Sequence, residues 1–224
     1  MARFAVHCHK MAVNNPYAQF RREVTLEEVM SSPLIADPIR LLECAPVGDG
    51  AAALVLCNED FLKRSPRDVL VEVAGSAVAT DILSVHERKD PLTMTGFRKA
   101  AGEAMKRAGI EASDVDVLEV HDAFTVLGIL TLEALGYAPP GKGWQLVAEG
   151  ELEPGGRIPT NTMGGLKARG HPVGGTGVYQ VFDLVRQLRG EAGANQVEGA
   201  EIGLAQNLGG VAGTVAVHVM KRVR

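Results

Sequence analysis

Apolar and polar positions follow two periods along this chain, the helical period of three to four residues and the alternation of a β-strand. Helical spacing over 2–13 and 95–108 predicts two helices, the second capped by Thr95 and ended by Gly109. The same patterns predict the remaining elements: a short helix after Thr25 with Glu28 completing a capping box, strands at 51–57, 68–78, 115–120, 200–206 and 213–220, and helices from Asp122 to Leu135 and from Gly177 to Leu188. Strand and helix alternate in the second part of the chain, which favours an α/β fold with a parallel or mixed sheet.

The sequence pattern also predicts details of the helix over 177–188 and of the turn between the last two strands. The helix over 177–188 has a single apolar face, which is expected to be buried and consists of Val178, Val181, Phe182, Val185 and Leu188. The last two strands are expected to be joined by a tight glycine turn over 207–210.

Composition and charge narrow the class of protein. The chain has 224 residues, of which 46% are apolar and 22% charged, so one large or two small domains with a real core are expected. Pro66 and the charges around it suggest a boundary between 1–65 and 66–224.

A net charge of −4 without a Lys or Arg cluster argues against a nucleic-acid partner. No apolar run approaches the ~20 residues of a membrane span, and three cysteines without CxxC spacing favour a reduced, cytoplasmic setting with no metal site.

Three loops lie where strands end or helices begin, which is where an α/β sheet presents functional groups. They are "VHDAF" at 120–124, "GGLKARGHPVGGTG" at 164–177 and "QNLGG" at 206–210. His121 in the first loop is placed to donate a hydrogen bond to a developing negative charge. The alternative is a half-buried histidine that helps to cap the following helix.

His171 lies in the second loop, between glycines that let the backbone approach a ligand closely, and Pro172 stiffens the exit from it. A neutral histidine held in this way is suited to removing a proton from a thiol or an alcohol. The alternatives are an elaborate turn before a helix, or a phosphate site at the helix N-terminus, for which the P-loop lysine spacing is missing.

The three loops also resemble a known family. "NTMGGLKARGHPVGGTG", 161–177, resembles the signature loop of the thiolase superfamily, in which an Asn, a Gly-Gly pair, Gly-His-Pro and Gly-x-Thr-Gly occur in this order. "EVHDAFT" is similar to the matching loop of the sterol-carrier-protein-type and archaeal-type thiolases, and "AQNLGG" to the last catalytic loop. The segment from Asn14 to Leu56 looks like the middle of such a protein, so the resemblance covers essentially the whole chain.

The resemblance implies a layered α/β thiolase-like fold. Residues 66–224 would form one complete C-terminal βαβαβαββ half, and 1–65 the tail of the N-terminal half, with its loop region and last strand. The implied reaction is acyl transfer on acyl-CoA thioesters, as in acetyl-CoA acetyltransferase or 3-ketoacyl-CoA thiolase. Coenzyme A enters as the substrate thioester, and no resident cofactor is implied.

The resemblance also implies roles for individual residues. His171 would deprotonate a nucleophilic cysteine and, with His121, bind the thioester oxygen. Asn161 would order the loop, the backbone around Gly209 would contribute to a second oxyanion hole, and Asn207 stands where many thiolases carry an acid/base cysteine.

Further substrate contacts are expected from the same loop. Gly165 and Gly170 belong to the glycine framework that lets the backbone approach the substrate. Lys167, with Arg169, is expected to meet a phosphate of coenzyme A, the alternative being an exposed, solvated charge.

The nucleophile itself is expected to lie outside this chain, because the family's cysteine belongs to a region upstream of the segment at which the sequence begins. Cys8 is flanked by His7 and His9 but has the surroundings of a helix, whereas a reactive thiol needs a loop or helix N-terminus. Three functions therefore stay open: an acyltransferase that is either completed by a second chain or shortened relative to its family, an aldolase-like enzyme acting on a CoA thioester, and a non-catalytic subunit. A homo-oligomer or a heteromer is expected, with a small OB-fold and zinc-ribbon protein as a further partner.

Overall fold

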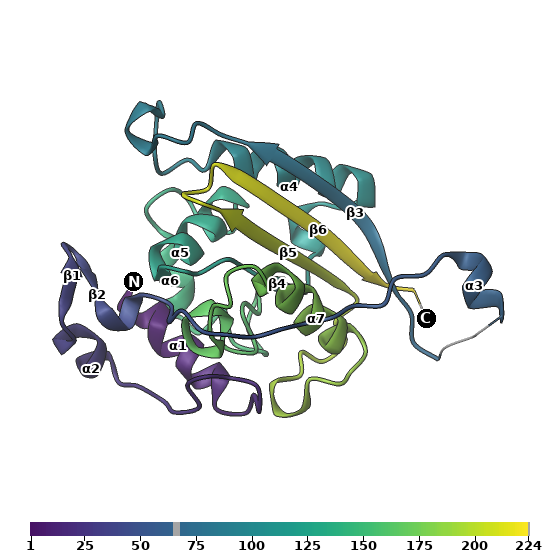
Figure 1. Ribbon diagram of the computed structural model, residues 1–224, viewed down its shortest axis with the longest axis horizontal. Helices are drawn as coiled ribbons and strands as arrows, with labels where there is room; N and C mark the ends of the chain where they lie inside the picture. Colours follow the sequence, from purple (N-terminus) through teal and green to yellow (C-terminus); the bar gives the residue numbers. More distant parts are fainter. Residues whose placement is uncertain (65–67, 224) are drawn as a thin grey trace.

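A four-stranded mixed sheet organises the molecule (Figure 1). The computed structural model describes residues 1–64 and 68–223. In spatial order the strands are β3 (Val71–Thr80), β6 (Thr214–Arg222), β5 (Ile202–Gly209) and β4 (Val117–Glu119). β4 runs parallel to β5, and the other two pairs are antiparallel. The predicted mixed α/β sheet is thus confirmed.

Helices cover both faces of this sheet. α4 (Thr95–Ala108) packs on β3 and β6, whereas α7 (Thr176–Leu188) packs on β5 and β4 (Figure 1). Alternate residues of β6 serve the two layers, since Val217 and Val219 join the core on the α4 side and Met220 joins the core beneath α7. The sheet therefore has a helix on each face, but α7 does not reach β3, where the side chain of Val78 is 65% exposed.

A helical layer lies beside the sheet. α1 (Ala2–Ala12) packs against α5 (Thr125–Ala134) and α6 (Gly143–Ala148) and against a π-helical turn, Gly165–Arg169. Gly128 of α5 permits the contact with α1, because a Cβ there would lie 2.3 Å from the Phe4 ring. α1 is therefore built into the same body as the 164–177 loop.

The remaining elements are short. α2 (Leu26–Ser31) begins with the predicted capping box, in which Thr25 and Glu28 bond to each other's main-chain N–H groups. The small β1–β2 hairpin and a short helix of the connection follow: β1 is Leu34–Ala36, β2 is Ile39–Arg40 and α3 is Glu59–Arg64.

Most predicted helices are confirmed, but the predicted cap of α4 is wrong. Thr95 is the first helical residue, and Met94, in the left-handed region, precedes it as the cap. The carboxylate of Asp81, at the end of β3, accepts the hydrogen bond from the Gly96 N–H. A residue distant in sequence thus replaces the local cap, while Gly109 ends the helix as predicted.

The predicted strand at 51–57 is wrong. These residues are extended without strand pairing, and the side chains of Val55 and Leu56 are 94% and 78% exposed. A strand forms only where a neighbour completes its hydrogen bonds, and within the described residues 51–57 pairs with none of the strands of either sheet. The predicted boundary between residues 65 and 66 lies outside the described residues.

Four smaller differences concern the sheet and α7. β4 is shorter than predicted, and the third strand of the expected βαβαβαββ unit is reduced to a parallel bridge between Leu118 and Thr160. Residues 207–209 belong to β5, so the hairpin turn begins at Gly210. Of the expected α7 face only Leu188 is fully buried, whereas the side chains of Gln180, Asp183 and Gln187 are buried as well. α7 therefore buries a largely polar face.

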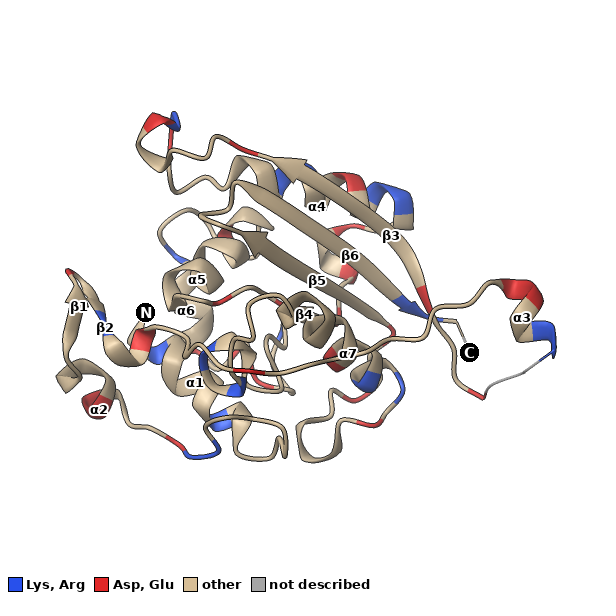
Figure 2. Ribbon diagram, in the orientation of Figure 1, with Lys and Arg blue, Asp and Glu red and all other residues tan. Residues whose placement is uncertain are grey.

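Charges are mixed over the surface elements. Figure 2 shows acidic and basic residues intermingled along α4 and at opposite ends of α3, while β5 carries none. In the ranges 1–64 and 68–223, every helix is too short or too polar to cross a bilayer.

Candidate active site

His121 and His171 come together although fifty positions of sequence separate them. Their ring centroids are 5.2 Å apart, and the rings stand edge to face at 89°. His121 follows β4 and His171 precedes α7, so each lies at the end of an element that packs in the sheet core. This arrangement is consistent with the expectation, implied by the resemblance, that both histidines bind one thioester oxygen.

His121 is held from both its main chain and its ring. Its N–H donates to Gln206 Oε1 at 2.8 Å, and its ring Nδ1 lies 3.1 Å from Asn207 Nδ2. Burial, and secondarily the neighbouring His171, lowers the pKa of His121 to about 4. The ring is therefore neutral at pH 7.

His171 is more open. Its N–H donates to the Pro46 carbonyl at 3.1 Å, and Nδ1 lies 2.7 Å from Thr176 Oγ1 in the first turn of α7. Burial first, and then the charge of Arg169, lowers the pKa of His171 below its ordinary value. Nδ1 is thereby engaged, and Nε2 forms no hydrogen bond with any of the described residues.

Asp122 does not cap α5, contrary to the prediction. Helix α5 begins at Thr125, and the Asp122 carboxylate instead accepts main-chain hydrogen bonds from Leu166 at 2.7 Å and Lys167 at 3.3 Å. The Cys8 thiol donates to the same carboxylate at 3.3 Å. Three donors from two other segments outcompete the local helix end, and they tie the His121 loop to the 164–177 loop.

The environment of Cys8 is that of a structural thiol. It is fully buried on α1, and burial together with the Asp122 charge raises the pKa of Cys8 well above its usual value. A thiol in this state is protonated at neutral pH. The burial of Cys8 and its contact with Asp122 therefore support the expectation that Cys8 is not the nucleophile.

Asn161 joins the two histidine loops from beneath. Its Oδ1 accepts from the Val120 N–H at 2.8 Å, and its Nδ2 donates to the Val120 carbonyl at 3.2 Å. Its φ of 49° lies in the left-handed region, where few residues other than glycine are stable. The side chain is completely buried, which suits the predicted ordering of the loop rather than direct contact with a substrate.

Two glycines of the loop are required by conformation and space. Gly165 has φ of 57°, and a Cβ there would lie 2.4 Å from Asn161 Nδ2 and 2.6 Å from Asp122 Oδ2. Gly170 has φ of 117° and lines a cavity of about 290 Å³ with His171, Pro172 and residues that include Tyr17, Gln19, Gly48, Asp49, Arg169 and Tyr179. Gly165 thus serves loop packing, whereas Gly170 borders a cavity open to a ligand.

Lys167 does not belong to the lining of this cavity. Its side chain is 1% exposed, with Nζ 3.3 Å from His9 Nε2 and 5.6 Å from the centre of the Phe20 ring. Burial lowers the pKa of Lys167. Contact with a coenzyme A phosphate stays a prediction for Lys167, and its burial does not favour it.

A buried ion pair underlies the loop and was missed by sequence reasoning. The Arg169 guanidinium contacts the Asp183 carboxylate, and Glu119 lies 3.9 Å away. Arg169 also stacks over Tyr179, with 5.1 Å between guanidinium and ring centre. The sequence carries no clear signal for this pair, because Asp183, with Arg186 three residues on, looks like a solvent-facing residue of an amphipathic helix.

Asn207 and Gly209 lie near the end of β5. Asn207 Nδ2 contacts both Gln180 Oε1, at 2.8 Å, and His121 Nδ1. Gly209 is exposed and pairs with Thr214 at the end of the ladder. Asn207 therefore joins the histidine pair directly, and Gly209 presents its backbone at the rim.

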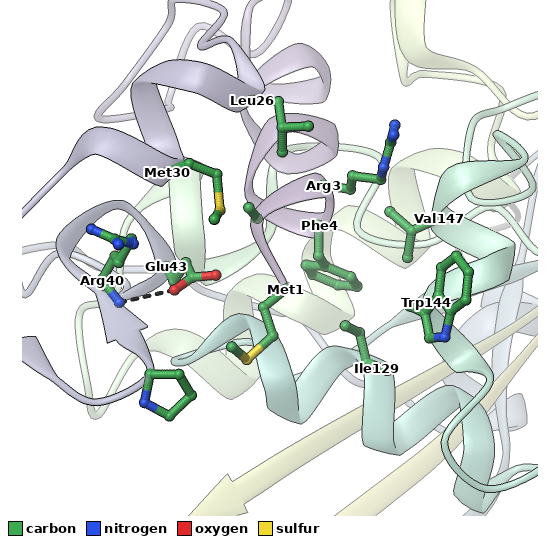
Figure 3. A pocket seen from close by; sticks show the side chains of 12 residues that line it. Met1, Arg3, Phe4, Leu26, Met30, Arg40, Glu43, Ile129, Trp144 and Val147 are labelled. Carbon is green, nitrogen blue, oxygen red and sulfur yellow. Dashed lines mark hydrogen bonds between the residues drawn. The ribbon is translucent and has the colours of Figure 1, made fainter. Parts of the chain in front are cut away.

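A second cavity of about 380 Å³ lies at the start of α1 (Figure 3). Its walls are mostly apolar, with Phe4, Met30 and Trp144 among them. The Arg40 N–H donates to Glu43 Oε2 at 2.8 Å at one side. None of its lining residues belongs to the histidine pair or to the loops that carry it, so the two cavities are separate.

The fold and the paired histidine loops define a thiolase-like domain, and comparison with known proteins identifies the family. The model described as thiolase C-terminal domain-like matches residues 77–222. An acetyl-CoA acetyltransferase of Methanothermobacter thermautotrophicus is 47% identical over 222 residues, which are 99% of this chain and 58% of that protein. Sterol carrier protein 2 of Oryctolagus cuniculus is 45% identical over 217 residues, 95% of this chain and 40% of that protein. The chain belongs to the thiolase family, and it spans about half the length of these relatives.

Solved structures agree on the fold. The Ltp2-ChsH2(DUF35) aldolase has a TM-score of 0.87 and 25% identity, over 100% of this chain and 58% of that chain. A monomeric SCP2-thiolase like protein type 1 of Mycobacterium smegmatis has a TM-score of 0.70 and 20% identity, over 99% of this chain and 46% of that one. The predicted thiolase-like fold is confirmed.

Proposed function

We propose that this chain is the histidine-bearing part of a thiolase-type acyltransferase acting on acyl-CoA thioesters, as acetyl-CoA acetyltransferase or 3-ketoacyl-CoA thiolase. The observation that carries the proposal is the pair of histidines, His121 and His171, 5.2 Å apart and with lowered pKa values. Two neutral imidazoles at one site supply a base and a hydrogen-bond donor.

The residues divide the chemistry of acyl transfer between them. His171 takes the proton of a cysteine thiol, and the thiolate attacks the thioester carbonyl carbon. His121 donates a hydrogen bond to the carbonyl oxygen as it gains negative charge. When the tetrahedral intermediate collapses, coenzyme A leaves as a thiolate, and His171 donates to it the proton that came from the cysteine.

We place the nucleophilic cysteine on another segment or chain, since neither Cys8 nor Cys44 has the surroundings of a reactive thiol. Cys8 is buried against Asp122, and the Cys44 thiol donates to the Arg40 carbonyl at 3.4 Å. A homo-oligomer or a second chain would supply that segment.

All three cysteines are free thiols, which supports a reduced, cytoplasmic location.

A second candidate is an aldolase-like lyase that makes or breaks a carbon–carbon bond on a CoA thioester. The likeness to the Ltp2-ChsH2(DUF35) aldolase favours it. The pairing of Ltp2 with ChsH2 in that aldolase also supports a partner protein, for which a small OB-fold and zinc-ribbon protein is our candidate. In this reaction the histidines would bind the thioester enolate without a cysteine.

The two candidates are separated by supplying the missing part. The chain is co-expressed with the portion of the M. thermautotrophicus acetyltransferase outside the matched region, and the purified complex is given acetoacetyl-CoA plus coenzyme A, or a 3-hydroxyacyl-CoA alone. The intact M. thermautotrophicus enzyme serves as the positive control. His171→Ala and, as a matched surface control, His86→Ala are assayed in parallel.

Each outcome has a distinct meaning. Coenzyme-A-dependent cleavage that His171→Ala abolishes and His86→Ala leaves intact supports the acyltransferase. Cleavage of the 3-hydroxyacyl-CoA without coenzyme A supports the lyase. A stable complex that catalyses neither reaction contradicts both and leaves a non-catalytic subunit that binds acyl-CoA.

A further inference from the structure

The fixed side chain of Gln180 points to a role that the histidines alone do not reveal: we infer that Gln180, acting through Asn207, holds the single proton of His121 on Nε2. Gln180 is a positioning residue in this inference and contacts no substrate. The meaning for catalysis rests on the proposed function, but the proton's location is a property of the free chain.

The orientation of Gln180 is set by a main-chain carbonyl. Its amide lies 2.9 Å from the Gln206 carbonyl oxygen, which can only accept a hydrogen bond, so the atom facing it is Nε2. The opposite end of the amide is then Oε1, an acceptor. Gln180 is completely buried, so water cannot stand in for either partner.

The orientation of Asn207 follows from that of Gln180. The Asn207 atom 2.8 Å from Gln180 Oε1 must be a donor and is therefore Nδ2. The same Nδ2 lies 3.1 Å from His121 Nδ1 and presents its second proton there. Nδ1 of His121 accepts this hydrogen bond and carries no proton of its own.

The neutral ring then has its proton on Nε2. A neutral imidazole carries one proton, and which nitrogen bears it is set by the partner of the other nitrogen. Because Nε2 forms no hydrogen bond with the described residues, its N–H is free to donate to an oxygen that gains negative charge. The opposite tautomer would present a lone pair and repel that oxygen.

Gln206 anchors both ends of this relay. Its carbonyl orients Gln180, and its side-chain Oε1 accepts the main-chain N–H of His121 at 2.8 Å. Both protons of the Asn207 amide are consumed in the relay, so Asn207 presents only its oxygen to a ligand. Asn207 thus orients His121 and does not itself donate to an oxyanion.

The test is ¹⁵N NMR of the histidine rings in the full chain at pH 7, without substrate. In the wild type we expect one resonance pattern for His121, with a protonated Nε2 and an unprotonated, hydrogen-bonded Nδ1. The exposed His86 reports the tautomer mixture of a solvated ring. A His121 protonated on Nδ1 would overturn the inference.

Gln180→Met removes the relay while filling the same space. We expect the separation between the two His121 ring resonances to shrink towards that of His86. Gln187→Met is the matched control, because Gln187 is also a buried glutamine of α7 bonded to main chain, but its amide contacts the 195–197 segment and Thr162. The control should leave the His121 resonances in place.

A second variant covers the case in which Gln180→Met does not fold. Asn207→Leu breaks the relay at a half-buried position near the end of β5, and the same shift of His121 is expected. An unchanged His121 pattern in either folded variant contradicts the inference. Since no substrate is present, this outcome is independent of whether the complemented enzyme transfers acyl groups.

Discussion

Arg169, two residues before His171, forms an ion pair with Asp183, and both side chains are only 3% exposed. Removing one partner of a buried pair leaves an uncompensated charge, which costs about 3–5 kcal/mol. Asp183→Asn preserves the shape of the side chain and should lower the free energy of unfolding by this amount in urea denaturation. Glu103→Gln breaks the exposed pair with Arg107 and should cost under ~0.5 kcal/mol. Equal losses in the two variants would contradict a stabilising role for the buried pair.

The buried His121 predicts a dependence of stability on pH. Its pKa falls from 6.5 to about 4 on folding, so between these values the unfolded chain binds more protons and acidification favours unfolding. From pH 7 to pH 5 this one group should remove about 2 kcal/mol of stability. His121→Gln should therefore lose about 2 kcal/mol less than the wild type over that interval, whereas His86→Gln at the surface should follow the wild type. Parallel stability curves for His121→Gln and wild type would refute the prediction.

Gly165 predicts a sharp contrast between two glycines of one loop. Gly165→Ala places a Cβ in the left-handed region and within 2.4–2.8 Å of Asn161 and Asp122, so a loss of about 2–4 kcal/mol is expected. Gly174→Ala meets no atom within 4 Å at an ordinary φ and should change stability by less than ~0.5 kcal/mol. Thermal unfolding of both variants decides the matter, and a neutral Gly165→Ala would show that the loop is not held as described.

The exposed apolar segment at 51–57 predicts association. Val55 and Leu56 are almost fully exposed, and such side chains favour contacts between chains. Light scattering should give a mass above that of one chain, and Val55→Asp with Leu56→Asp should reduce it. Leu92→Asp, at another exposed leucine, should not. A wild-type chain that stays monomeric at high concentration would speak against this surface as an interface.

Local patterns predicted α1, α2, α4, α5, α7 and the final hairpin, but not the short helices α3 and α6. The loop resemblance predicted that His121 and His171 belong to one site. The errors share a physical cause. Asp122 and Thr95 were both taken as local helix caps, but Asp122 bonds to Leu166 and Lys167, and the cap contact near Thr95 comes from Asp81. A hydrogen bond to a residue distant in sequence leaves no periodic signal.

The other differences between the predicted and the observed structure concern the strand predicted at 51–57 and the buried polar residues of α7. The segment 51–57 has the composition of a strand, yet pairing depends on a neighbour that composition does not reveal. Gln180 and Asp183 look like solvent-facing residues of an amphipathic helix, but their partners, Gln206 and Arg169, lie in the core. The polar half of the site was therefore hidden from periodicity.

The main-chain hydrogen bond from His171 to Pro46 also indicates where the polypeptide chain could be cut or extended without loss of the site. It secures the histidine loop immediately before the chain departs into the exposed stretch 51–64. Exposed connections tolerate nicking and insertion, because little packing or hydrogen bonding is lost there. Residues 1–50 and the sheet-bearing remainder should thus reassemble when expressed as two polypeptides, and a fluorescent protein inserted into 51–64 would report on the molecule without displacing His171.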